Sequence, residues 1–200
     1  MLLDVKDLRV TFRSTGKEAV HGISLCLDEG ERLGLVGESG SGKTVTAMAI
    51  SGLIERSNVD MSGSVTFDGK DLMSYSRDEL RTIQGKDIGV VFQEPMTSLN
   101  PLMRIGAQVE ETLMIHTGMS PEDRKKAALQ ALEEVGIHDP ETTYAKYPHQ
   151  LSGGQRQRVM IASAMIIHPK LVICDEPTTA LDVTIQAQIL DLIKDLQEEH

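Results

Sequence analysis

The chain has 200 residues, with 20 lysines and arginines against 30 aspartates and glutamates, so its formal net charge is −10. This acidity and an aromatic content of only 3% argue against a nucleic-acid surface built from basic stripes and stacking rings. No apolar run approaches the ~20 residues that span a bilayer, and the first residues lack a signal-peptide pattern. We therefore expect one cytoplasmic domain, with Cys26 and Cys174 as reduced core thiols because neither has a paired-ligand spacing.

The first part of the chain alternates apolar and polar residues, as half-buried strands do. This alternation predicts strands over residues 3–12 and on both sides of an Asp-Glu-Gly turn within "ISLCLDEGERLGLVG", residues 23–37. From Lys43 to Ile54 the apolar residues recur at helical spacing. The stretch "SVTFDGKDL", residues 64–72, again predicts a strand and a turn.

Two apolar runs frame a mostly helical stretch in the remainder of the chain. They are "DIGVVFQ" at 87–93 and "LVIC" at 171–174, and both have the composition of strands buried inside parallel sheets. Helices are predicted from about Gln155 to Ile167 and over residues 183–199. Strands and helices that alternate in this way indicate an α/β domain, interrupted by an all-helical insertion.

Helix boundaries inside the insertion are indicated by two similar dipeptides. Asn100 precedes Pro101 and Ser120 precedes Pro121, so each pair predicts an N-terminal cap followed by a first helical residue. We expect Gly136 to close the helix that begins at Pro121, because glycine readily adopts the left-handed conformation that ends a helix.

Residues 37–44, "GESGSGKT", match the pattern G-x-x-x-x-G-K-[ST] between a predicted strand and a predicted helix. Glycines let backbone N–H groups turn toward phosphate oxygens, and the helix N-terminus adds its positive dipole. Lys43 supplies a point charge, and the hydroxyl of Thr44 can ligate Mg²⁺. The alternative is a flexible Gly/Ser loop. The predicted phosphate-binding residues are Gly37, Ser39, Gly40, Ser41, Gly42, Lys43 and Thr44.

A phosphate-binding loop of this kind needs an acid at the end of a neighbouring strand to hold the metal. Asp175 follows the second buried strand and can hold Mg²⁺, while Glu176 can orient or deprotonate a water. Gln93, which closes the first buried strand, can reach the same metal or a terminal phosphate. The alternative is that these side chains only solvate strand ends.

The stretch "LSGGQRQR", residues 151–158, predicts a second helix start. Ser152 and Gln155 form the pattern of a capping box, which explains these two residues without any ligand. It does not explain Gly153 and Gly154, because each glycine in a first helical turn costs roughly 1 kcal/mol relative to alanine. A phosphate on this helix N-terminus would require such a bare backbone. The chain would then have two phosphate-binding helix ends.

These motifs together resemble those of the ATP-binding subunit of ABC transporters, and the resemblance covers the whole chain. In that family two subunits pair head to tail, and each ATP lies between the P-loop of one and the "LSGGQ" helix of the other. The resemblance implies a P-loop NTPase core with an antiparallel β subdomain. It also implies one nucleotide-binding domain, with residues 1–95 and 155–200 as the core and about 96–154 as an inserted helical subdomain.

The resemblance also implies the role of each motif residue. Glu176 and Gln93 would be catalytic, and Thr44, Gln93 and Asp175 would hold Mg²⁺. Phe12 is similar to the aromatic residue that stacks on adenine, although it fits equally well as an edge-strand core residue. ATP would otherwise contact the P-loop together with Ser152, Gly153, Gly154, Gln155 and, in the D-loop at 180–182, Asp182.

Two further stretches resemble the branch that imports oligopeptides, dipeptides and nickel. They are "FQEPMTSLNP" at 92–101 and "DEPTTALDVTIQAQIL" at 175–190. The resemblance implies an ATPase at the cytoplasmic face of the membrane, with its helical subdomain docked on transmembrane permease subunits and an extracytoplasmic solute-binding protein as an indirect partner. It leaves open the solute, which could be a peptide, nickel or glutathione, and the choice between a homodimer and a heterodimer.

One position departs from the family pattern. The family has a switch histidine on a strand beyond the D-loop helix, whereas His200 still falls within the pattern of that helix. We therefore expect a truncated subunit that lacks the last strands, and its hydrolysis of ATP stays open. A non-transport ABC ATPase and a fragment that binds ATP without turnover remain alternatives. Five other histidines show no metal-ligand spacing and are expected in turns or at the surface: His21, His116, His138, His149 and His168.

Overall fold

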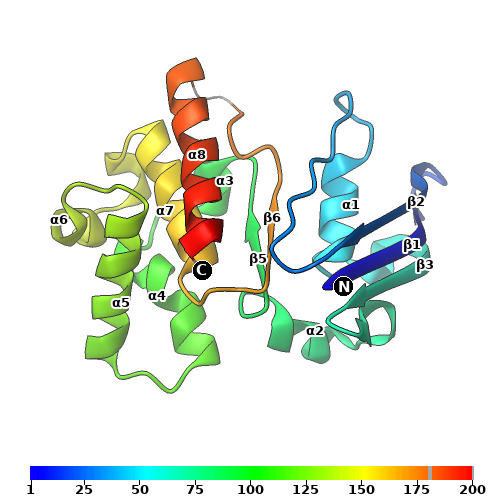
Figure 1. Cartoon of the computed structure of the whole chain (residues 1–200), viewed down its shortest axis with the longest axis horizontal. Coiled ribbons are helices and arrows are strands. Elements are labelled where there is room, and N and C mark those ends of the chain that lie inside the picture. The colour runs from blue at the N-terminus through cyan, green and yellow to red at the C-terminus, as the bar shows by residue number, and fades with distance from the viewer. Residues whose placement is uncertain (180–181, 200) are drawn as a thin grey trace. The chain divides into compact units, whose positions relative to one another are not determined.

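The computed structural model describes residues 1–179 and 182–199 of the chain. These residues fall into two compact units, Met1–Gln84 and Gly85–His200, which are described separately below. Figure 1 shows the strands and helices of each unit. Among the helices in the described ranges, none is long and apolar enough to cross a membrane.

The first unit contains a four-stranded antiparallel sheet in the order β2-β1-β3-β4 (Figure 1). Its strands are β1 (Leu3–Phe12), β2 (Glu18–Leu27), β3 (Val59–Phe67) and β4 (Lys70–Asp71). The turn between β3 and β4 places Asp68 at φ 48° and Gly69 at φ 75°. Two consecutive positive φ angles match a two-residue hairpin, for which Asp-Gly is a favoured sequence. The strand and turn predicted from "SVTFDGKDL" are confirmed.

A bulge in β1 keeps its apolar side chains on one face. Val5 and Leu8 are both buried although they are three positions apart. The pairing register shifts between Val5 and Leu8 against β2 and between Lys6 and Arg9 against β3. Asp7 has a φ of 44° at this bulge. Gly63 on β3 lies opposite, where a Cβ atom would overlap the backbone oxygens of Lys6 and Asp7. The bulge therefore requires glycine at position 63.

Four helical segments complete this unit. They are α1 (Lys43–Ile50), η1 (Arg56–Asn58), η2 (Leu72–Ser74) and α2 (Arg77–Ile83). The predicted continuation of α1 to Ile54 is wrong, because Gly52 adopts a φ of 70° and Leu53 returns its N–H to the carbonyl of Met48 at 2.9 Å. Such a left-handed glycine ends a helix.

The strand predicted ahead of residues 37–44 is not formed. No regular structure is assigned to residues 31–38, and Leu33, Leu35 and Val36 are exposed. The alternation of side chains is present, but a strand also needs a hydrogen-bonded neighbour. β2 ends at Leu27, paired with Leu3, and residues 31–38 pair with no strand among the described residues.

The expectation that Cys26 lies in the core is wrong, because Cys26 lies on β2 with its side chain exposed. Cys174 is largely buried, and its burial raises the pKa of the thiol to about 11.

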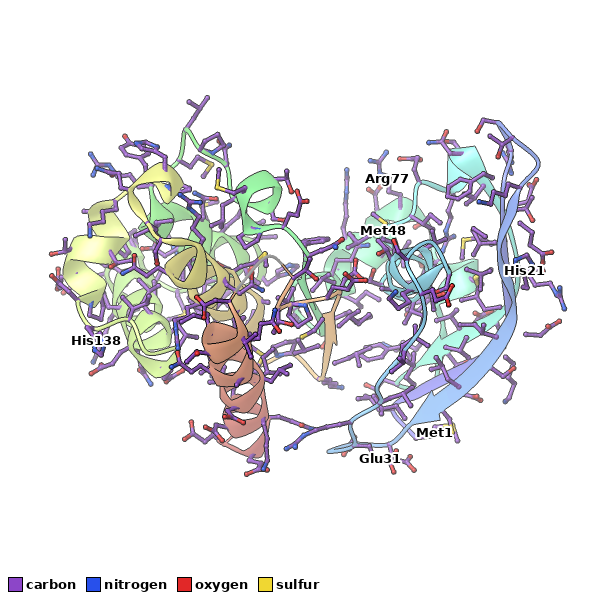
Figure 2. All side chains as sticks on the ribbon, turned by 90° about the horizontal axis from the view of Figure 1, so that it is seen from above. Met1, His21, Glu31, Met48, Arg77 and His138 are labelled. Carbon is purple, nitrogen blue, oxygen red and sulfur yellow. The ribbon has the colours of Figure 1, made fainter. Side chains whose placement is uncertain are left out.

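His21 lies on β2 and projects from the sheet into solvent, as Figure 2 shows. Its ring nitrogen lies 3.1 Å from a carboxylate oxygen of Glu18.

The second unit contains two parallel strands and most of the helices. β5 (Ile88–Val91) pairs with β6 (Leu171–Cys174) from Ile88 opposite Leu171 to Val91 opposite Cys174. Both strands predicted from the apolar runs are confirmed. The helical segments are α3 (Pro95–Ser98), α4 (Ile105–His116), α5 (Pro121–Glu134), α6 (Pro140–Ala145), η3 (Pro148–Gln150), α7 (Gly153–Met165) and α8 (Val183–Glu199).

One of the two predicted helix starts is confirmed. The hydroxyl of Ser120 accepts the N–H of Asp123 at 3.1 Å, Pro121 is the first residue of α5, and Gly136 follows its end at φ 77°. Asn100 instead accepts the N–H of Leu102 at 3.0 Å in a turn, and α4 begins only at Ile105. Asparagine favours both caps and turns, and here the turn forms.

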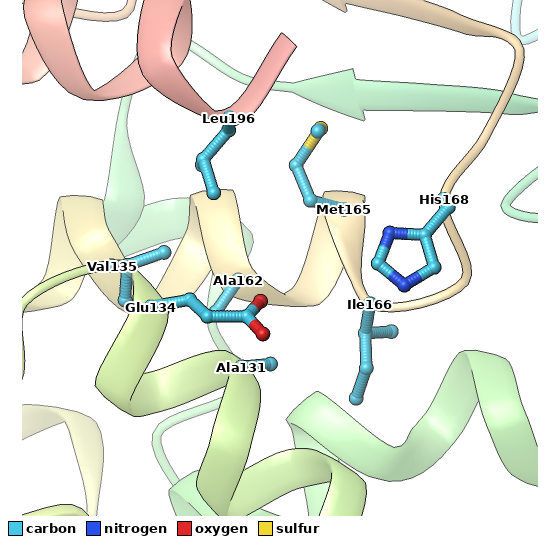
Figure 3. Close-up of a pocket in the computed structure, with 8 residues that line it drawn as sticks. All are labelled: Ala131, Glu134, Val135, Ala162, Met165, Ile166, His168 and Leu196. Carbon is cyan, nitrogen blue, oxygen red and sulfur yellow. The ribbon is translucent and has the colours of Figure 1, made fainter. Parts of the chain in front are cut away.

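The core of the second unit is formed by α4, α5, α7 and α8 packed against the strand pair. Fully buried side chains from each of these helices meet there: Ile105, Val109, Leu132, Val159, Ile161 and Ile189. α5, α7 and α8 leave a small hollow that Figure 3 shows, lined mostly by apolar side chains such as Ala162, Ile166 and Leu196. Glu134 and His168 are the two polar residues of this lining.

The histidines of the second unit have surface or turn positions. His138 lies at its surface (Figure 2), His149 is exposed, and His116 is partly exposed at the end of α4. His168 is exposed in the turn after α7 with a φ of 53°. Among the described residues, no cluster of three histidine, cysteine or acidic side chains could hold a metal ion.

Candidate functional site

Residues 37–44 form an exposed glycine-rich loop that leads into α1. Gly40 has a φ of 79° and Gly42 a φ of 95°. Gly42 precedes the first helical residue, and a Cβ atom there would overlap the carbonyl oxygen of Ala19. Glycine at position 42 therefore allows both the left-handed turn and the close approach of the backbone. Because Gly42 has no side chain to cap α1, the first backbone N–H groups of this helix can donate to an anion.

Lys43 lies within this loop rather than away from it. Its ammonium donates to the carbonyl oxygens of Gly37 at 2.8 Å and Glu38 at 3.1 Å. Ser41 packs on Gly37, where a Cβ atom would lie 2.6 Å from the serine hydroxyl. Ser39 is exposed, as is Thr44 in the first turn of α1. The loop thus gathers a positive charge, three hydroxyls and a helix N-terminus in the first unit.

The carboxyl ends of β5 and β6 bring three predicted residues together. Because the strands are parallel, their ends meet at one edge of the sheet, and the N–H of Asp175 donates to the carbonyl of Val91 at 2.9 Å. The side-chain amide of Gln93 donates to Glu176 Oε2 at 3.0 Å. Asp175 is only 9% exposed. Gln93, Asp175 and Glu176 therefore form one polar cluster, although 82 residues of sequence separate Gln93 from Asp175.

Glu176 has a backbone conformation that few side chains adopt, with a φ of 45°. Strained conformations of this kind concentrate at functional sites. The hydroxyl of Thr179 also donates to Glu176 Oε2, at 3.0 Å. Sequence reasoning missed Thr179. The available signal was a hydroxyl residue three positions after Glu176 with Pro177 between them, which is the spacing of a turn.

The helix start at Ser152 contains the expected capping box. Ser152 Oγ accepts the N–H of Gln155 at 3.2 Å, and Gln155 Oε1 accepts the N–H of Ser152 at 3.0 Å. Local capping thus explains Ser152 and Gln155, as the alternative supposed. A Cβ atom at Gly154 would lie at ordinary contact distance, 3.4 Å, from Ile185. Packing within the chain therefore does not require glycine at position 154.

The model of the ABC transporter family matches residues 20–179, which include the loop at 37–44, the two strand ends and the helix start at Ser152. The chain belongs to the ABC transporter family. It is 53% identical to the oligopeptide transport ATP-binding protein OppD of Bacillus subtilis, over 99% of the chain and 56% of that protein. It is 48% identical to OppD of Escherichia coli, over 99% of the chain and 59% of that protein. This ABC chain spans somewhat more than half the length of these relatives.

The fold is also that of solved ABC cassettes. A dimeric structure of the ATP-binding cassette MJ0796, bound to ADP and Pi, superimposes with a TM-score of 0.87 and 34% identity, covering 99% of this chain and 84% of that one. The cassette cbiO1 of Clostridium perfringens superimposes with a TM-score of 0.81 and 30% identity, covering 99% of this chain and 74% of that one. These matches confirm the predicted α/β fold class.

Two predicted ATP contacts of this ABC chain, Phe12 and Asp182, belong neither to the loop at 37–44, nor to the cluster at the strand ends, nor to the helix start at Ser152. Phe12 is the last residue of β1, is half-buried and pairs with Val59, which suits either of its two predicted roles. Asp182 caps α8, because its carboxylate accepts the N–H of Ile185 at 3.0 Å. The other D-loop residues, Ala180 and Leu181, lie outside the described residues, as does His200.

Proposed function

We propose that this chain is the ATP-binding and ATP-hydrolysing part of a subunit that powers an importer of peptides. The observation that carries the proposal is the hydrogen bond from Gln93 to Glu176, 3.0 Å long, beside the buried Asp175. In this proposal Glu176 is the general base and Asp175 the metal-binding acid at one sheet edge, and the chain also contains a glycine-rich loop with a lysine. These are the parts that phosphoryl transfer to water needs.

The oxygen donors of the proposed site fit Mg²⁺. This ion prefers carboxylate, amide and hydroxyl oxygens and takes few ligands from protein, the rest being water and phosphate. Asp175 offers a carboxylate, Thr44 a hydroxyl and Gln93 an amide oxygen, since the amide nitrogen of Gln93 is engaged by Glu176. When bound, Mg²⁺ would neutralise the charge that develops on the phosphates. Lys43 would add a fixed positive charge.

Glu176 is proposed as the general base for hydrolysis. Its carboxylate would orient the attacking water and accept a proton from it. The backbone N–H groups at the start of α1 and the Lys43 ammonium would hold the phosphates in place during this step.

A head-to-tail pair of chains is proposed as the working unit. The starts of α1 and α7 both carry glycines, whereas one ATP has only one terminal phosphate. ATP would therefore lie between Lys43 of one copy and Gly153 and Gly154 of the other, with Phe12 and Asp182 as further contacts. The solved cassettes MJ0796 are dimeric. Both a homodimer and a heterodimer satisfy this geometry.

The proposed permease partner would bind the helical region at about 96–154, at the cytoplasmic face of the membrane. Apolar side chains are exposed in this region after β5, where Met96 is 60% and Leu102 86% exposed. Peptides are the proposed solute, because OppD of Bacillus subtilis and OppD of Salmonella typhimurium are oligopeptide transport ATP-binding proteins. A solute-binding protein outside the membrane would act on this subunit only through the permease.

The full-length subunit, reconstituted with its permease in liposomes, tests the proposal. We expect peptide-stimulated release of phosphate from ATP, and at least a 100-fold slower release for Glu176→Gln with ATP binding retained. Glu122→Gln, on the exposed first turn of α5, is the matched control and should behave as the wild type. Equal turnover by wild type and Glu176→Gln would contradict the proposal. So would turnover that peptides never stimulate, which would favour a non-transport ATPase.

A further inference from the structure

One carboxylate oxygen of Glu176 accepts two hydrogen bonds from other side chains. Glu176 Oε2 accepts from the Gln93 amide at 3.0 Å and from the Thr179 hydroxyl at 3.0 Å. A carboxylate oxygen has two lone-pair positions. Both positions on Oε2 are therefore engaged by side chains of this chain.

The backbone holds Thr179 in the position from which its hydroxyl reaches Glu176. The N–H of Thr179 donates to the carbonyl of Glu176 at 3.1 Å, which closes a four-residue turn. Pro177 lies within this turn and has a nearly fixed φ. Thr179 therefore contacts Glu176 twice, once through the main chain and once through the carboxylate.

Gln93 and Thr179 reach Glu176 from different segments. Gln93 comes from the end of β5, whereas Thr179 belongs to the turn that follows β6. A carboxylate held by one donor can still rotate about its side-chain bonds. Two donors that come from different segments restrict this rotation more than one donor does.

We propose that Thr179 is a positioning residue for hydrolysis, which holds the carboxylate of Glu176 in the orientation that the attacking water needs. This inference rests on the proposed function. In the reaction, the water oxygen bonds to the γ-phosphorus, the bond from that phosphorus to the bridging oxygen breaks to give ADP, and a proton of the water passes to the carboxylate of Glu176. Thr179 does not touch ATP in this account, so it affects the rate of the chemical step rather than the binding of ATP.

The two conservative replacements of Thr179 separate the hydroxyl from the shape of the side chain. Thr179→Val keeps the branched shape and removes the donor, whereas Thr179→Ser keeps the donor. Thr178→Val is the matched control, since within the described residues no hydrogen bond joins the Thr178 hydroxyl to Glu176. Thr179 is exposed, so the replacements should leave folding intact.

The experiment measures kcat and KM for ATP in the reconstituted full-length subunit. Misplaced catalytic groups cost up to about 100-fold in rate, and for Thr179→Val we expect kcat to fall about tenfold with KM within about twofold. Thr179→Ser and Thr178→Val should stay within about threefold of the wild type. The inference is overturned if Thr179→Val keeps its kcat, or if Thr179→Ser or Thr178→Val loses as much as Thr179→Val.

Glu176→Gln, measured in the same assay, distinguishes a failure of the inference about Thr179 from a failure of the proposed function. If the wild type is no faster than Glu176→Gln, hydrolysis does not depend on Glu176, and both the proposed function and this inference are wrong. If Glu176→Gln is slow and Thr179→Val is as fast as the wild type, only the inference about Thr179 is wrong.

Discussion

The ring of Tyr144 on α6 lies directly on Gly106 of α4, so close that a Cβ atom at position 106 would overlap three atoms of the ring. We expect Gly106→Ala to lower the free energy of unfolding by about 1–3 kcal/mol, the usual cost of overpacking. Gly118→Ala is the control, because nothing lies within 4 Å of a Cβ atom at that position. Urea denaturation of both variants checks this, and equal stability of the two would contradict the contact.

Tyr144 should also make stability depend on alkaline pH. Burial, and then the hydrogen bond that its hydroxyl donates to Glu110, raises the pKa of Tyr144 to about 12 from 10.0. The protonated form is thus favoured in the folded state, so its stabilisation is complete below pH 10 and is lost as the pH rises through 12. Lys125 over the ring and Arg124 beside Glu110 are the other charged neighbours.

Tyr144→Phe isolates this effect from other groups that titrate at high pH. We expect the wild type to lose more stability than Tyr144→Phe between pH 10 and pH 12, as measured by urea denaturation at each pH. Parallel loss in both proteins would show that Tyr144 does not titrate differently in the folded state.

The two cysteines should differ strongly in reactivity. Cys26 is exposed, whereas Cys174 is only partly exposed at the end of β6 and has a thiol pKa raised to about 11. Because the thiolate is the reactive form, Cys174 should resist alkylation in the folded protein. Treatment with a maleimide at neutral pH, followed by peptide mass analysis, should show modification at Cys26 alone and at both positions in denaturant. Rapid labelling of Cys174 without denaturant would contradict its burial.

Gly154 offers a way to block pairing of two chains without harming the fold. Among the described residues, a Cβ atom there meets only Ile185, at 3.4 Å, and a negative side chain in the first turn of α7 interacts favourably with the helix dipole. The same charge would repel a phosphate presented by a partner. We expect Gly154→Asp to fold and bind ATP as the wild type, yet to fail to dimerise with ATP in a Glu176→Gln background. Light scattering measures this, and unchanged dimerisation would refute the proposed role of this helix start.

Local patterns predicted elements whose stabilising contacts lie nearby in the sequence. The start of α5 at Ser120 and its end at Gly136 follow from contacts within four residues, and so does the Asp68-Gly69 hairpin. The strand predicted after the Asp-Glu-Gly turn, ahead of residues 37–44, is not formed, because alternation fixes the side-chain faces and cannot supply a neighbouring strand. Cys26 was misplaced because residue type predicts burial only on average.

The candidate site was predictable where a motif encodes its own backbone geometry. Gly42 has a left-handed φ and lies close to the backbone of Ala19, so its position requires glycine. The glycine pattern of the motif therefore predicts this geometry directly. The contact between Gln93 and Glu176 needed the parallel pairing of β5 and β6, which joins distant parts of the sequence. Thr179 escaped prediction because a threonine after a Glu-Pro turn is a common surface residue, and only its hydroxyl contact distinguishes it.

The most direct test of the account is ATP-dependent cross-linking between two copies of the full-length subunit. One copy carries Ser39→Cys in the glycine-rich loop and the other carries Gly153→Cys at the start of α7, both in a Glu176→Gln background with Cys26 and Cys174 replaced by serine. We predict that a short bismaleimide joins the two copies when ATP and Mg²⁺ are present and fails to join them without nucleotide. Cross-linking that ATP does not increase would contradict a nucleotide held between Lys43 of one chain and Gly154 of another.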